Sequence, residues 1–102
     1  MTPLTARTQT IVSFLFPHSA ADVEQFLAEE CGQNLPFCEN STPESLERIR
    51  FAVLKIGNGD WTKFGQALDL AKRDWRDVLM WAEFTNDLDA HQKWADQLLA
   101  DR

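Results

Sequence analysis

The chain has 102 residues, of which 44% are hydrophobic and 25% are charged, and these values are typical of a single globular domain with one modest core. Its formal net charge of −6 argues against nucleic acid as a partner, because Lys and Arg must neutralise phosphates in such complexes. The same charge argues against binding to an anionic membrane surface. We expect one domain over residues 1–102.

The first 18 residues contain a short apolar run from Ile11 to Phe16. The run is shorter than the apolar core of a secretory signal peptide, and one basic residue precedes it, so we expect a cytoplasmic protein with no membrane span. Six residues do not distinguish a helix from an extended strand-like arm. Because Phe14 and Phe16 are costly to expose, we expect the segment either to dock on the chain or to act as a flexible or swapped arm that packs on another subunit.

A helix is predicted over 20–31, where Ser19 begins a segment like a capping box and a narrow apolar stripe follows. The next segment, 33–41, contains Pro and two Asn residues, which are typical of a loop. Within this loop, Leu35 and Phe37 are expected to anchor into the core.

A second helix is predicted over 43–56, with Pro43 in its first turn. Its apolar positions alternate in steps of three and four residues: Leu46, Ile49, Val53 and Ile56. This wide stripe predicts the central helix of the fold.

Three pairs of an acidic and a large apolar residue follow: Asp60-Trp61, Asp74-Trp75 and Asp87-Leu88. Asp at such a position accepts hydrogen bonds from the free N–H groups of a helix start and suits the positive end of the helix dipole. The pairs predict three helices, over 61–72, 75–84 and 88–100. The expected fold class is therefore all-α, a compact bundle of about five short helices with a short apolar N-terminal arm or helix.

The last sixty residues or so resemble a family of small uncharacterised bacterial all-helical proteins. The resemblance rests on the segment 47–55, on Asn58-Gly59-Asp60, on the D-W-R-D pattern over 74–77 and on the A-H-x-x-W pattern over 90–94. It implies a recurring helical module and implies no activity.

The histidines and cysteines number two each: His18, Cys31, Cys38 and His91. A structural zinc site normally has close Cys and His pairs, and these spacings are much longer. We therefore expect no metal, no cofactor and two reduced, mostly buried thiols. A Cys31–Cys38 disulfide would require an oxidising compartment.

A polar site is conceivable where His91 lies near Asp87 and Asp89, since imidazole and carboxylates suit metal binding and acid–base chemistry. Arg76 is a further candidate, free to pair with an acid or to stack on a Trp. However, acidic residues are expected at a helix start as caps, and His91 takes an offset that is apolar in the two preceding helices. A histidine at the edge of the core is the simpler interpretation.

The helices over 61–72 and 75–84 have a spacing that could mimic a helix-turn-helix. In that arrangement Asp74 and Asp77 would face DNA phosphates, so a helical hairpin is favoured over DNA binding.

The segment 75–84 is apolar on nearly all sides, which predicts an exposed apolar face used for association. Of the four Trp residues, Trp81 is expected at the surface, and the other three, Trp61, Trp75 and Trp94, in the core. The predicted interaction surface consists of Phe14, Phe16, Met80, Trp81 and Phe84. We expect a non-catalytic protein-interaction module that forms a homodimer. The alternative is a small enzyme or metal-dependent protein using His91 with Asp87 or Asp89.

Overall fold

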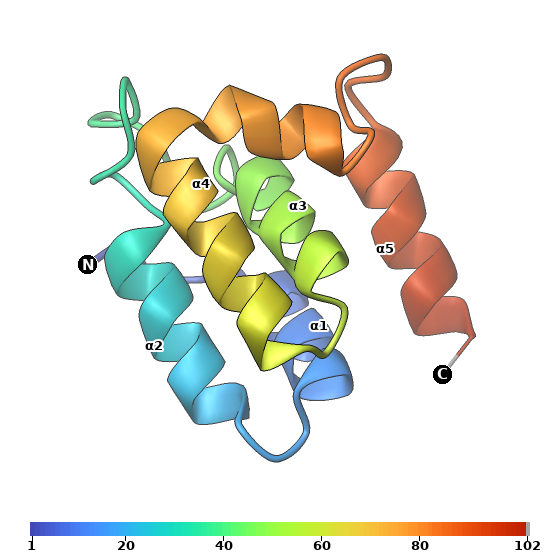
Figure 1. Ribbon diagram of the computed structural model, residues 1–102. Coiled ribbons are helices and arrows are strands. Elements are labelled where there is room, and N and C mark those ends of the chain that lie inside the picture. Colours follow the sequence, from blue (N-terminus) through green and yellow to red (C-terminus); the bar gives the residue numbers. More distant parts are fainter. Residues whose placement is uncertain (102) are drawn as a thin grey trace.

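The computed structural model describes residues 1–101, and in this part of the chain all regular secondary structure is helical (Figure 1). The helices are α1 (Ala6–Leu15), α2 (Ala20–Glu30), α3 (Glu47–Gly57), α4 (Trp61–Trp81) and α5 (Ala90–Ala100). The predicted all-α fold class is confirmed. No helix formed by residues 1–101 has both the length and the apolar character needed to cross a membrane.

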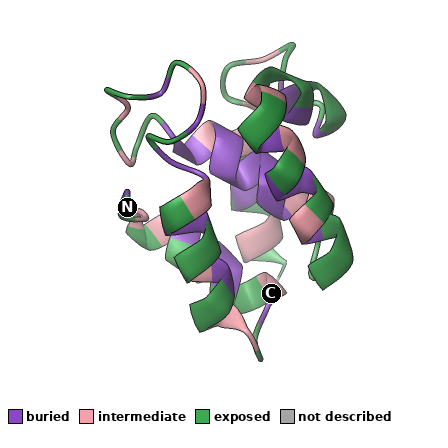
Figure 2. Ribbon diagram, turned by 60° about the vertical axis from the view of Figure 1, so that its left-hand side comes forward, coloured by how far each residue is buried: buried purple, intermediate pink, exposed green. Residues whose placement is uncertain are grey.

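Helix α3 forms the centre of the bundle, as predicted. It packs most extensively against α4 and also contacts α1 and α5. Buried residues concentrate along it, while the outer faces of the surrounding helices are exposed (Figure 2). The helix begins at Glu47 and not at residue 43, because Thr42 and Ser45 exchange side-chain to backbone hydrogen bonds in a preceding turn.

The N-terminal apolar run is helical and packs on its own chain. Thr5 caps α1 by accepting a hydrogen bond from the Thr8 N–H. Ile11 and Val12 are fully buried. Phe16, predicted to belong to the interaction surface, is only 4% exposed, because its ring packs edge-on against Phe64 at a centroid distance of 5.6 Å. That prediction is corrected: Phe16 is a core residue.

Helix α4 bends at Asp74. Asp60 caps its start by accepting from the Lys63 N–H at 3.0 Å. At Asp74 the backbone is extended, with φ −158° and ψ 97°, and Oδ1 accepts from the Arg76 N–H at 3.1 Å. The two helices predicted over 61–72 and 75–84 are therefore the two arms of one kinked helix, which changes direction at this residue (Figure 1).

Helix α4 ends at Trp81, earlier than the predicted residue 84, in a Schellman-type cap. Glu83 has φ 65°, and its N–H donates to Met80 O, while the Phe84 N–H donates to Leu79 O at 2.9 Å. This turn directs Phe84 back into the core, where it is 1% exposed. Phe84, also predicted at the interaction surface, is thus a second correction.

Helix α5 starts at Ala90, two residues after the predicted start at 88. Asp87 does not cap it, because Oδ1 of Asp87 accepts from the Asp89 N–H in a turn that precedes the helix. Trp94 lies half-buried between Phe51 and Phe84, with ring centroids 6.0 and 6.2 Å away.

The long connection between α2 and α3 is held by Leu35 and Trp75. Leu35 is buried, as predicted. Phe37 is not an anchor: it has φ 65° and its side chain is largely exposed. The Trp75 indole N–H donates to Pro36 O at 2.6 Å, so the loop is fastened through its backbone and the exposed Phe37 is not needed for this purpose.

The buried side chain of Arg50 holds the first residues of the chain against the bundle through hydrogen bonds. Its guanidinium is fully buried and donates to Thr2 O, Pro3 O and Cys31 O at 2.7–2.8 Å. Burial lowers the pKa of Arg50 from its usual value and raises the pKa of the Cys31 thiol to about 12. Three backbone carbonyls therefore take the place of the water molecules that would hydrate this guanidinium at the surface.

Candidate functional site

The polar residues singled out in the sequence do not assemble into one site. Arg76 is exposed and forms an ion pair with Asp74, with Nε 3.1 Å from Oδ1. Asp87 is engaged by Lys93, whose Nζ lies 2.6 Å from Oδ2. Asp89 precedes α5 and makes no side-chain cap bond. Among residues 1–101, no group of three or more His, Cys, Asp and Glu side chains is arranged to hold a metal ion.

His91 packs at the edge of the core. Its ring centroid lies 5.8 Å from that of Phe51 and 6.2 Å from that of Phe84. Nδ1 is buried without a hydrogen-bond partner in the described structure, as is Nε of the nearby Arg48. Burial lowers the pKa of His91, and the positive charge of Arg48 lowers it further. This environment favours a neutral imidazole that acts as a packing surface.

Three of the five predicted interaction residues are at the surface: Phe14, Met80 and Trp81. Met80 and Trp81 are adjacent at the end of α4, and Trp81 is 50% exposed. The C-terminal end of α1, which carries Phe14, lies far from the C-terminal end of α4 (Figure 1). The exposed residues therefore form two separate patches.

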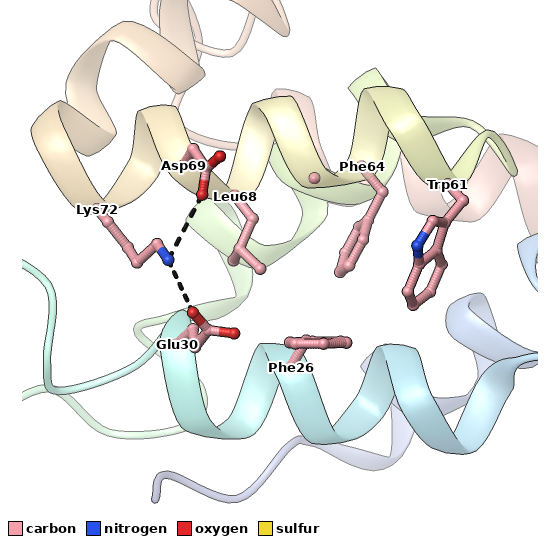
Figure 3. A pocket seen from close by; sticks show the side chains of 8 residues that line it. Phe26, Glu30, Trp61, Phe64, Leu68, Asp69 and Lys72 are labelled. Carbon is pink, nitrogen blue, oxygen red and sulfur yellow. Dashed lines mark hydrogen bonds and ion pairs between the residues drawn. The ribbon is translucent and has the colours of Figure 1, made fainter.

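A groove between α2 and the first arm of α4 is the feature that sequence reasoning missed (Figure 3). It encloses a cavity of about 270 Å³. The lining side chains come from one face of each helix, Phe26, Glu30, Trp61, Phe64, Leu68, Asp69 and Lys72, and Gly65 also lines the groove. We call this the aromatic groove.

Two aromatic side chains on the rim of the groove are partly in water. Phe26 is 39% exposed and Trp61 is 48% exposed, with ring centroids 5.8 Å apart in an edge-to-face arrangement. In Figure 3, Trp61 and Phe64 extend from α4 toward α2, and Phe26 faces them from the opposite side. Trp61 was predicted to be a core residue, so its exposure corrects that expectation.

An ion-pair network closes the other end of the groove. Lys72 Nζ lies 2.7 Å from Glu30 Oε1 and 3.5 Å from Asp69 Oδ1 (Figure 3). The hydrogen bond to Glu30 is the main cause that raises the pKa of Lys72. One end of the groove is therefore apolar and aromatic, and the other is charged and already paired.

Gly65 widens the groove on its α4 side. It lies within a helical arm, where glycine costs about 1 kcal/mol relative to alanine. A Cβ atom at this position would have no atom within 4 Å other than those of its chain neighbours and of the nearby backbone of its own helix, so internal packing does not require glycine here. The absent side chain leaves open space next to Phe64 and Leu68.

One signal in the sequence was available. The groove side of α4 follows the helical period: Trp61, Phe64, Gly65, Leu68, Asp69 and Lys72. This stripe begins with a large aromatic residue, is interrupted by Gly65 and ends with charges, which is unusual for a face that is fully buried.

Two of the sequence patterns on which the resemblance rests lie at a helix kink and at a helix that packs on the core. The D-W-R-D residues, 74–77, form the kink of α4, and the A-H-x-x-W residues, 90–94, begin α5 and pack on the core. No family model, curated protein or solved structure matches the chain.

Proposed function

We propose that this chain is a non-catalytic protein-interaction module whose aromatic groove binds an apolar segment of another protein. The observation that carries this proposal is the partial exposure of Phe26 and Trp61 on facing sides of a preformed groove. Aromatic residues in such positions are typical of the energetic centres of interfaces. The cavity is slightly smaller than the roughly 300–1,000 Å³ of small-molecule sites, which favours one or two inserted side chains over a metabolite.

The setting that we propose is the cytoplasm, where the free thiols of Cys31 and Cys38 would persist. The net charge of −6 supports protein over nucleic acid as the partner. We also propose that related small bacterial helical proteins share the module, on the sequence patterns over 74–77 and 90–94.

The alternative, a small enzyme or metal-dependent protein built on His91 with Asp87 or Asp89, has weaker support. The Asp87 carboxylate is engaged by Lys93, and the His91 ring packs between two phenylalanines.

The groove proposal is tested by differential capture. Gly65→Leu fills the groove, and the fold should tolerate it because leucine favours helices and the space is open. Gln66→Leu adds the same side chain to the next, exposed position of α4, which does not line the groove, and serves as the matched control.

Quantitative mass spectrometry of proteins captured from a lysate on each immobilised variant gives the readout. We expect at least one protein to be retained by the wild type and by Gln66→Leu and lost by Gly65→Leu. Identical sets on all three proteins would refute recognition through the aromatic groove.

A further inference from the structure

The α2 side of the aromatic groove carries acidic residues. Helix α2 contains four carboxylates and neither Lys nor Arg. Glu30 lines the groove, whereas Glu24 lies on another face of α2, beside Met1 and Pro3. Asp22 and Glu30 lie one turn before and one turn after Phe26, so they share its stripe on the helix. Among residues 1–101, Glu30 pairs with Lys72, whereas Asp22 and Glu29 form no ion pair.

Lys72, the basic residue that lines the groove, already forms ion pairs within the chain. Lys72 lies between Glu30 and Asp69, and these three side chains together carry a charge of −1. The exposed residues Lys63 and Arg73 of α4 are not among the lining residues. Asp22 and Glu29 likewise flank the groove without lining it, and they give its α2 side a negative charge that no ion pair in the described part of the chain offsets.

The length of the groove indicates the kind of segment that fits. The lining residues of α4 run from Trp61 to Lys72, which corresponds to roughly 16 Å along a helix at 1.5 Å per residue. A partner helix of about three turns spans this length. Such a helix presents large apolar side chains at steps of three and four residues, and these match the open space near Trp61 and Gly65.

We propose that the aromatic groove binds a basic amphipathic helix of another protein, with its apolar face against Trp61 and Phe26 and its Lys and Arg residues facing α2. This inference rests on the proposed function and specifies the partner. A second copy of this chain does not meet the requirement, because it carries the same net charge of −6.

Two synthetic peptides of about fourteen residues test the partner class, since this length covers three helical turns and the ends. Both peptides have the same Leu and Phe positions on one face. The polar face of the first consists of Lys and Arg, and that of the second consists of Glu. Binding is followed by ¹⁵N–¹H correlation spectra of the full chain at low and high salt.

We expect the basic peptide to perturb amides of α2 and of residues 61–73 and to bind at least about tenfold more tightly than the acidic one. High salt should reduce this preference, because exposed charges are screened. Glu29→Lys should weaken binding of the basic peptide at least about threefold. A lysine is also compatible with the C-terminal end of α2, because a positive charge is favourable there. Glu83→Lys makes the same change of charge at an exposed residue beyond α4 and should have little effect.

The outcomes separate this inference from the function on which it rests. Equal binding of both peptides in the groove, lost in Gly65→Leu and kept in Gln66→Leu, would refute the basic partner and support the docking function. Tighter binding of the acidic peptide would also refute the basic partner. Absence of any groove perturbation at about millimolar peptide, or perturbations confined to another face, would overturn both proposals.

Discussion

Arg50 places a guanidinium in the core with backbone carbonyls as its hydrogen-bond acceptors. The planar fork of arginine reaches three carbonyls at once, and a lysine ammonium does not reproduce that geometry. We predict that Arg50→Lys lowers the free energy of unfolding by at least about 2 kcal/mol, since buried acceptors are left unpaired. Urea denaturation measures this change.

The matched control is Arg73→Lys. Arg73 is exposed on α4, so its replacement should change the free energy of unfolding by less than about 0.5 kcal/mol. If Arg50→Lys were as mild as the control, the three hydrogen bonds would not be important for stability.

Asp74 determines how the two arms of α4 meet. Its side chain accepts from the Arg76 backbone and side chain, and the side-chain bond is the main cause that lowers the pKa of Asp74. We predict that Asp74→Ala lowers the melting temperature by about 4–8 °C, the effect of losing one helix cap in a domain of this size. Asp74→Ser retains a capping oxygen and should be nearly neutral.

Thermal denaturation followed by circular dichroism distinguishes the possibilities. A higher helix content in Asp74→Ala with an unchanged melting temperature would mean that the chain accepts a straight helix here. Equal losses in the Ala and Ser variants would rule out a simple cap.

Local signals predicted most of the helices. The spacing of apolar residues identified α2 and α3, and Asp60 and Asp74 identified the two arms of α4, because helix starts depend on residues close in sequence. The end of α4 was missed because the left-handed residue of its cap is Glu83 and not glycine. That single turn also explains why Phe84 was wrongly expected at the surface.

The aromatic groove could not be predicted from local sequence patterns. It depends on how α2 packs beside α4, and the residues that meet there, Phe26 and Trp61, are far apart in the chain. Trp61 has the same place after its Asp as Trp75, yet the two differ because Trp75 finds a backbone acceptor in the long loop. Long-range packing therefore determines which Trp side chain is buried, and the local sequence pattern carries no information about that packing.

Among residues 1–101, exposed large apolar side chains gather at the aromatic groove and, as Met80 and Trp81, at the end of α4. Phe14, Phe37 and Leu88 are exposed elsewhere. From the N-terminal run, Phe14 is exposed, whereas Ile11, Val12 and Phe16 are buried and Leu15 is partly buried. Deleting residues 1–16 would remove core side chains such as Ile11 and Val12, so a point substitution is the cleaner test of self-association.

Trp81 provides that test. A side chain of this size that is half exposed next to Met80 favours contact with a second copy, and a two-fold dimer is the commonest arrangement of such proteins. We predict a dimer at about micromolar concentration, weakened at least about tenfold by Trp81→Glu, because the charge would be desolvated in the interface. Phe37→Glu changes an even more exposed aromatic residue in the α2–α3 connection and should leave the dimer intact. Sedimentation equilibrium gives the masses, and a monomer at hundreds of micromolar for the wild type would exclude self-association through the end of α4 while leaving the aromatic groove as the interaction surface.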